Sequence, residues 1–232
     1  MYSAIRRLVI IIYDPKRYMN TVKLLRARGI QYNVPDSLNF KVLTNDVIYT
    51  DSIDVFKKFK DKVAKVFYDP KGTRYVLEKA ILALKDKKVY NLLSIGIDPG
   101  GKYTVIALAD GELIDWDHIS DIDSLRKYVS DLLASIPAKE KVVRVGIGGR
   151  GLEIAYIIRK AVENEVVIEA VDEVGSTPHG YRNPFIERIL SNIRSNIDNS
   201  ITRKRDLYAA IIIALKEGFP VDIYVEDRTE QK

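Results

Sequence analysis

The sequence predicts an α/β protein in which a small domain with a mainly parallel sheet precedes a larger domain with a mixed sheet. In residues 1–85, short apolar runs rich in β-branched residues alternate with helical segments, which is typical of parallel sheets. In residues 91–232, three apolar segments follow one another with only tight-turn signals between them, which indicates an antiparallel meander. A charged run at 85–88 separates the two patterns and is predicted to be a linker.

The first domain, a basic α/β domain over residues 1–85, is expected to alternate strands and helices. Asp14-Pro15 opens the first helix as N-cap and first-turn proline, and Gly29 ends it. Strands are predicted at 8–13, 30–34, 46–50 and 64–68. Helices are predicted at 16–28, 53–62 and 73–84.

The second domain, residues 91–232, is predicted to have the element order βββαβαβα. Strands are predicted at 92–98, 103–109, 112–117, 142–147 and 166–171. Helices are predicted at 122–135, 152–162, within 175–197 and at 202–218. A further strand at 221–225 is left open.

The composition excludes several kinds of chemistry. The chain has no Cys, which rules out disulfides, Cys-ligated zinc, iron–sulfur clusters and cysteine nucleophiles. It has only two His, His118 and His179, which argues against a multi-His metal site. No apolar run approaches the ~20 residues that a membrane span needs, so we expect a soluble, cytoplasmic protein without a membrane partner. The lack of Cys and the scarcity of Gln are also features of heat-adapted proteins.

The charge is divided unevenly along the chain. Residues 1–90 carry 19 basic and 9 acidic side chains, a net charge of +10, whereas residues 91–232 carry 18 and 23, a net charge of −5. This division favours a polyanion such as nucleic acid as partner of the first half and a metal ion as partner of the second. A Lys-rich solvated surface is the alternative.

An Asp-Pro pair ends three predicted strands, at Asp14, Asp69 and Asp98. A helix follows Asp14 and Asp69, so helix capping accounts for both of them. A hairpin follows Asp98, so there is no helix for it to cap. A carboxylate at the end of an apolar strand costs free energy unless something pairs with it. Metal binding is the favoured interpretation of Asp98, and an Asx-turn at the Pro-Gly-Gly bend is the alternative.

Four segments of the second domain carry a family resemblance, over about residues 91–218. They are the Gly-Ile-Asp-Pro-Gly strand at 96–100, the strand at 143–149, the Asp-Glu-Val-Gly-Ser-Thr segment at 172–177 and the helix that begins Lys-Arg-Asp-Leu-Tyr-Ala-Ala at 204–210. In this order they resemble the ribonuclease-H-like nucleases, and more closely the Holliday-junction resolvases of the RuvC and YqgF type.

The resemblance implies a metal-dependent nuclease that hydrolyses phosphodiester bonds in structured DNA with two Mg²⁺ (or Mn²⁺) ions. It implies that Asp98 bridges both ions, that Glu173 or its rival Asp172 holds one, and that Asp206 reaches the other. Carboxylate oxygens suit these hard cations. His179 is a candidate to carry a proton to or from the reacting oxygens.

Basic side chains are candidates for binding the nucleic acid. Arg150 lies in a Gly-rich turn before a helix, where the glycines serve either phosphate binding or a close strand–helix turn. Three basic residues flank Asp206, and a Lys-rich patch lies in the first domain. The candidates named from these two groups are Arg203, Lys204, Arg205, Lys57 and Lys58.

Two other functions stay open. RuvC carries an acid on the fourth strand, where this chain has Gly146–Arg150. This difference favours the YqgF pattern and leaves room for a catalytically inactive nucleic-acid-binding or scaffolding protein that retains the fold. An actin-like ATPase is a weaker alternative, because only one such fold is present. A junction resolvase needs two symmetric active sites, so a homodimer belongs to the leading hypothesis.

Overall fold

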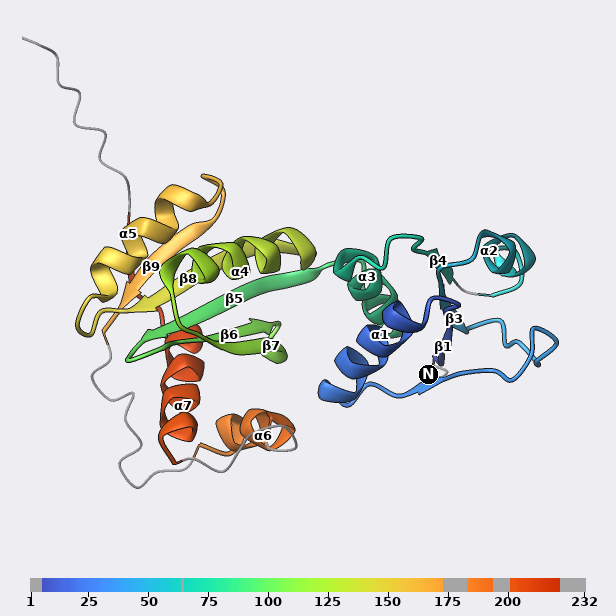
Figure 1. The fold of residues 1–232 in the computed structure, drawn as a ribbon, viewed down its shortest axis with the longest axis horizontal. Helices are drawn as coiled ribbons and strands as arrows, with labels where there is room; N and C mark the ends of the chain where they lie inside the picture. The colour runs from blue at the N-terminus through green and yellow to red at the C-terminus, as the bar shows by residue number, and fades with distance from the viewer. Residues whose placement is uncertain (1–5, 64, 173–182, 194–200, 222–232) are drawn as a thin grey trace, which may run out of the picture. The chain divides into compact units, whose positions relative to one another are not determined.

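The computed structural model of the chain describes residues 6–63, 65–172, 183–193 and 201–221 (Figure 1). It is an α/β structure with one sheet in each half of the chain, which confirms the predicted α/β class. Contacts divide it into two compact units. Unit 1 holds the residues up to Asn91 with two short segments, 131–139 and the described part of 188–198, and unit 2 holds the rest.

The sheet of unit 1 has four strands in the order β2-β1-β3-β4, and all of its described pairings are parallel. The strands are β1 (Leu8–Ile11), β2 (Tyr32–Asn33), β3 (Val47–Thr50) and β4 (Lys65–Tyr68). β1 ends two residues before its predicted end and β2 keeps two of its five predicted residues, whereas β3 starts one residue later than predicted. Residue 64, predicted to begin the fourth strand, lies outside the described residues.

Capping side chains fix where the three helices of this unit begin. These helices are α1 (Pro15–Ala27), α2 (Ile53–Phe59) and α3 (Arg74–Leu84). The side chains of Asp14, Ser52 and Thr73 each accept a hydrogen bond from a backbone N–H in the first turn of the helix that follows. Gly29, with a φ of 64°, follows the end of α1, as predicted.

The core of unit 1 lies on both faces of its sheet, because successive strand residues point to opposite sides. Leu8 and Ile10 pack with α1 and α3, whereas Val9 and Ile11 pack with α2. In Figure 1, α1 and α3 accordingly lie on one side of these strands and α2 on the other. The near-continuous apolar strands in the sequence reflect this burial on two faces.

The sheet of unit 2 is mixed, with the order β10-β9-β8-β5-β6-β7. Its strands are β5 (Tyr90–Pro99), β6 (Tyr103–Ala109), β7 (Glu112–Ile119), β8 (Ala138–Gly146), β9 (Val167–Val171) and β10 (Phe219–Pro220). The meander β5-β6-β7 is antiparallel, as predicted, and β8 and β9 are parallel to each other. The short β10 pairs antiparallel with β9 and begins before the predicted 221–225, of which 222–225 lies outside the described residues.

β5 and β8 also run in the same direction. They begin side by side, where the Tyr90 N–H donates to the Pro137 carbonyl at 2.9 Å. They end side by side, because Pro99 and Gly146 both lie against Gly151. The carboxyl ends of β5, β8 and β9 therefore share one edge of the sheet.

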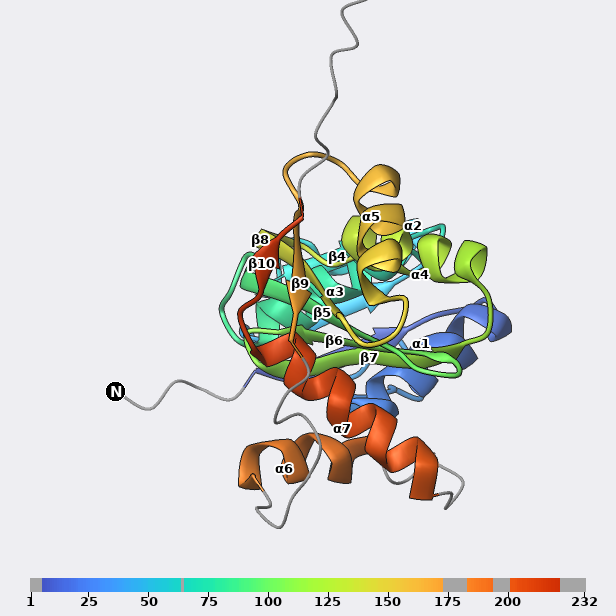
Figure 2. The same cartoon turned by 90° about the vertical axis from the view of Figure 1, so that its left-hand side faces the viewer.

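The helices of the second half of the chain are α4 (Ile122–Ser135), α5 (Gly151–Ala161), α6 (Pro184–Ile193) and α7 (Ile201–Leu215). Three of them, α4, α5 and α7, cover the two faces of this sheet (Figure 2). α4 and α5 lie on one face, and α7 packs against β6 on the other. Within the described residues, no helix combines the length and the apolar character that crossing a membrane requires.

Candidate acidic site at the carboxyl end of β5

Asp98 is the penultimate residue of β5, the first strand of the meander, and its side chain is half-buried. It pairs across the sheet with Thr104 of β6, which in turn pairs with His118 of β7. The buried Thr104 hydroxyl lies 2.9 Å from His118 Nδ1. Because residues directly opposite one another share a face, Asp98, Thr104 and His118 form a polar row across three strands.

α7 packs on the face that carries this row. The Ser94 hydroxyl donates to the carbonyl of Ala214. Gly96 lies against the backbone of Ala210, and a Cβ added to it would stand 2.6 Å from Ala214 N. Residues 94, 96 and 98 of a strand point to the same side, so Asp98 faces the same side as these two contacts.

Two positions on α7 meet this face of β5. Ser94 lies against Ala214, and Gly96 lies against both Ala214 and Ala210, one turn earlier on the helix. Asp98 is the next residue of β5 on the same face. Asp206 lies one turn before Ala210 on α7 and is half-buried.

A buried arginine of the sheet binds the C-terminal end of α7 by a hydrogen bond. Arg144 of β8 donates to the Ala214 carbonyl at 2.7 Å and to the Glu169 carboxylate of β9 at 2.7 Å. Glu169 also accepts from the Gly218 N–H at 3.2 Å, just after α7. Our sequence reasoning missed this group, although a lone Arg within an apolar strand is a signal for a buried ion pair.

The other predicted metal ligands lie apart or outside the described residues. Asp172 directly follows β9 and is exposed, and its backbone carbonyl accepts a hydrogen bond from Lys216 Nζ at 2.7 Å. β8 separates it from β5, which corresponds to ~10 Å at the usual spacing of strands. Glu173 and His179 lie outside the described residues. Among those that are described, no group of three His, Asp or Glu side chains is arranged to hold a metal ion.

The glycine-rich turn before α5 serves close packing of a strand and a helix. A Cβ at Gly151 would stand 2.8 Å from the carbonyl carbon of Gly146, so α5 begins directly against the end of β8. Of the two roles considered for these glycines, phosphate binding and a close strand–helix turn, this contact supports the close turn. Arg150 is exposed and forms a bidentate ion pair with Glu153, with N···O distances of 2.6 and 2.7 Å. The Arg150 hydrogen bonds hold the pKa of Glu153 below its ordinary value.

The remaining basic candidates belong to both units. Arg203 and Lys204 lie in the first turn of α7, and Arg205 next to them is exposed. Lys57 and Lys58 are exposed in the last turn of α2, in unit 1. Lys58 Nζ donates to the Leu38 carbonyl at 2.8 Å, so part of its hydrogen-bonding capacity serves the loop that covers α2.

Comparisons with known proteins supply no relative, since no family model, no curated protein and no solved structure matches this chain.

Proposed function

We propose that unit 2 is a metal-dependent endonuclease with a ribonuclease-H-like arrangement that cleaves structured DNA. The strand order supports this proposal, because an antiparallel meander β7-β6-β5 continues into the parallel strands β8 and β9. This mixed sheet is what the resemblance of residues 91–218 implies. The fold alone does not establish an activity, so the argument depends on the carboxylates.

The observation that carries the proposal is the position of Asp98 on the face of β5 against which α7, the helix that contains Asp206, packs. Hydrolysis of a phosphodiester needs an activated water and relief of charge on the leaving oxygen, and divalent cations supply both. Asp98 of β5 and Asp206 of α7 both offer carboxylate oxygens, the donors that suit Mg²⁺ or Mn²⁺. Asp98 and Asp206 would hold the metal, with Asp172 or Glu173 as a third ligand and His179 as a proton carrier.

The basic residues near α7 and α5 would bind the phosphate backbone. Arg205 and its neighbours Arg203 and Lys204 precede and flank Asp206 in sequence, so their contacts would lie beside the acidic site. Lys57 and Lys58 would add a sequence-independent contribution from unit 1. Symmetric cleavage of a four-way junction would further require a dimer with two such sites.

Cleavage assays of the full chain on a four-way junction, a flap and a plain duplex, with Mg²⁺ and with Mn²⁺, test the proposal. We expect cleavage by the wild type and a loss of at least ~10³-fold in Asp98→Asn, the order of effect seen when a group that stabilises the transition state is removed. DNA binding should persist. Asp123→Asn, which removes an exposed carboxylate of α4, is the control with the same charge change. Equal cleavage by Asp98→Asn and wild type would contradict the assignment.

A nucleic-acid-binding or scaffolding protein without catalysis is the second candidate. Within the described residues, β8 ends in Gly146 and adds no carboxylate beside Asp98, and no three-ligand acidic group is present. Wild type that binds the junction but leaves every substrate intact with both cations would favour this function over cleavage.

A further inference from the structure

Unit 1 contains a cleft that none of the roles above uses. It has a volume of about 490 Å³ and lies between the N-terminal halves of α1 and α3, with Tyr49 of β3 as part of its lining. The turn between β4 and α3, residues 71–73, forms one side. Cavities of ~300–1,000 Å³ are the size that binds small molecules.

The lining of the cleft is strongly basic. Four cationic side chains line it, two from α1 and two from the start of α3 and the turn before it: Lys16, Arg17, Lys71 and Arg74. Among the described residues that line the cleft, Asp14 carries the only carboxylate, so their net charge is four minus one, or +3. Thr73 and Asn20 add a hydroxyl and an amide. This set of groups recognises an anion.

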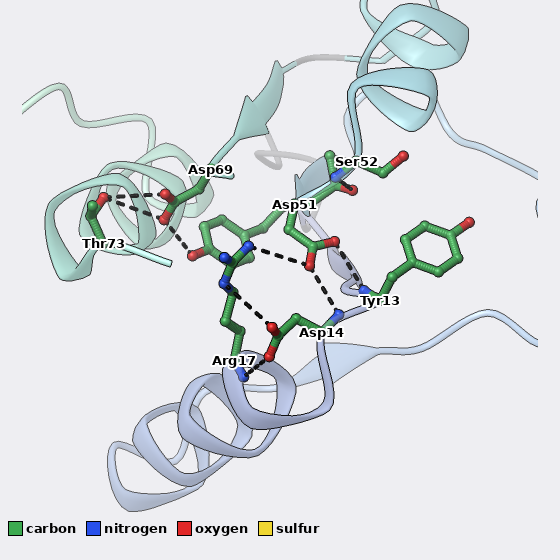
Figure 3. Close-up of polar contacts among 9 residues, drawn as sticks. Tyr13, Asp14, Arg17, Asp51, Ser52, Asp69 and Thr73 are labelled. Carbon is green, nitrogen blue, oxygen red and sulfur yellow. Dashed lines mark hydrogen bonds and ion pairs between the residues drawn. The ribbon is translucent and has the colours of Figure 1, made fainter. Parts of the chain in front are cut away.

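Two of the four cations are available to a ligand as they stand. Lys16 and Lys71 are exposed, and neither makes a hydrogen bond or an ion pair within the described part of the chain. Arg17 reaches two carboxylates at long range, Asp14 at 3.9 Å and Asp51 at 3.8 Å (Figure 3). Its guanidinium therefore has donors left for a closer, bidentate partner.

The fourth cation, Arg74, is a secondary partner of the carboxylate beside it. Glu78 is fully buried and bonds Arg28 at 2.5 Å and the Tyr90 hydroxyl at 3.1 Å. Arg74 Nε stands 3.9 Å from the same carboxylate. Because Arg28 already neutralises Glu78, the charge of Arg74 adds to the positive potential of the cleft.

The acids around the cleft are engaged by the protein itself. Asp51 accepts from the backbone N–H groups of Tyr13 and Asp14, at 2.9 and 3.0 Å (Figure 3). Asp14 accepts from the Arg17 N–H at 2.9 Å, and Asp69 from the Tyr49 hydroxyl at 2.7 Å. The hydrogen bonds of these carboxylates therefore hold together the ends of β1, β3 and β4, which the three acids follow. The side chains left to bind a ligand are the basic ones.

We propose that this cleft binds a terminal phosphate group, that is, a phosphate monoester. Arginine forks and lysine point charges are the usual partners of phosphate oxygens. A Cβ added at Gly72, whose φ is 66°, would stand 3.1 Å from the stem of Arg17, so this turn lies close beside the Arg17 side chain in the lining of the cleft. The monoester belongs either to a free nucleotide or to the 5′ end of a DNA strand. The proposal concerns unit 1 and is independent of cleavage by unit 2.

Calorimetric titration of the full chain tests this proposal with four probes: thymidine 5′-monophosphate, thymidine, and one short DNA strand with a 5′-phosphate or a 5′-hydroxyl. We expect the monophosphate to bind and thymidine not to bind. A 5′-phosphorylated strand that binds at least tenfold more tightly than both its 5′-hydroxyl form and the monophosphate identifies a strand end as the ligand. Binding of the monophosphate at least as tight as that of the strand identifies a free nucleotide.

The variant Lys16→Ala/Lys71→Ala should weaken the binding of the phosphate probe at least tenfold. The control Lys23→Ala/Lys41→Ala removes the same charge from exposed positions of unit 1 outside the cleft and should stay within twofold of wild type. Unchanged urea midpoints verify folding of both variants. Equal weakening by the two variants, equal binding of monophosphate and thymidine, or no binding of any phosphate probe would overturn the proposal.

Discussion

Gly96 of β5 lies directly against the backbone of Ala210 in α7, with no room for a side chain between them. The same contact includes the Ala214 side chain, whose Cβ stands 2.8 Å from the position of a Cβ on Gly96. The glycine therefore lets α7 approach the strand closely. This approach seats α7, the helix that contains Asp206, on the face of β5 to which Asp98 also points.

Gly96→Ala should destabilise the chain, because the added methyl group meets rigid backbone and α7 must move. Overpacking of a well-packed core costs about 1–3 kcal/mol, and we expect a loss of that size in the free energy of unfolding in urea. Gly101→Ala is the matched control, since nothing lies within 4 Å of a Cβ there. If Gly96→Ala unfolds at the same urea concentration as the control, the result would contradict the close contact between α7 and β5 at Gly96.

The buried pair of Arg28 and Glu78 should be sensitive to the loss of one partner only. Both side chains are almost fully buried, and the pKa of Arg28 is raised, because Glu78 and Tyr90 outweigh the lowering effect of burial. Glu78→Gln leaves a buried cation without its carboxylate, which costs about 3–5 kcal/mol. Urea unfolding of the variant measures this loss.

The double variant Arg28→Met/Glu78→Leu should recover most of that stability, because an apolar replacement of a buried pair removes both charges at once. Asp123→Asn, which breaks an exposed ion pair with Arg126, should change the free energy of unfolding by less than about 1 kcal/mol. A double variant as unstable as Glu78→Gln would show that packing around these side chains, and not the uncompensated charge, dominates.

The apolar runs and caps of the sequence predicted most elements, because both signals are local. Tyr103–Ala109 and Ile122–Ser135 have the predicted bounds, and the capping role of Asp14 is confirmed. Strand ends were predicted less well, since β8 begins at Ala138, four residues before the predicted start. Its first residues are polar and extended through pairing along the sheet, which a local pattern does not reveal.

The sites depend on contacts between distant residues, and these were less predictable. The sequence singled out Asp98 because its strand ends without a helix to cap, but the α7 contacts of Ser94 and Gly96 join residues more than 110 positions apart. The basic cleft of unit 1 combines α1 with the turn before α3, so its four cations are scattered in sequence. Only tertiary packing brings them together.

Releasing Arg150 from Glu153 should strengthen binding of DNA if Arg150 contacts phosphates. Glu153→Gln removes the carboxylate that occupies the Nε–Nη2 edge of the guanidinium. We expect the affinity for a four-way junction to rise about two- to fivefold at low salt, with the difference lost at high salt, because phosphate contacts are screened by ions. Asp123→Asn frees Arg126 in a comparable exposed pair and serves as control. Equal gains in affinity for both variants would show that the change in net charge, and not the release of Arg150, strengthens the binding of DNA.

Tyr49 should make unit 1 less stable at alkaline pH. Burial and the hydrogen bond to Asp69 raise the pKa of its phenol well above the ordinary 10.0. Below pH 10 the Tyr49 phenol is protonated in both the folded and the unfolded chain, so its contribution to the free energy of unfolding is complete. As the pH rises above 10, the phenol loses its proton in the unfolded chain but keeps it in the folded chain. Folding then weakens by about 1.4 kcal/mol per pH unit.

Tyr49→Phe removes this titration together with the hydrogen bond. At about pH 8 the variant should be less stable than wild type by roughly 1 kcal/mol, the usual contribution of one hydrogen bond. This difference in the free energy of unfolding should narrow and then reverse as the pH rises above about 10, because only the wild type loses stability through the Tyr49 phenol. Urea unfolding of both proteins across this range measures the gap. A gap that stays constant with pH would mean that Tyr49 ionises equally readily in the folded and unfolded chains.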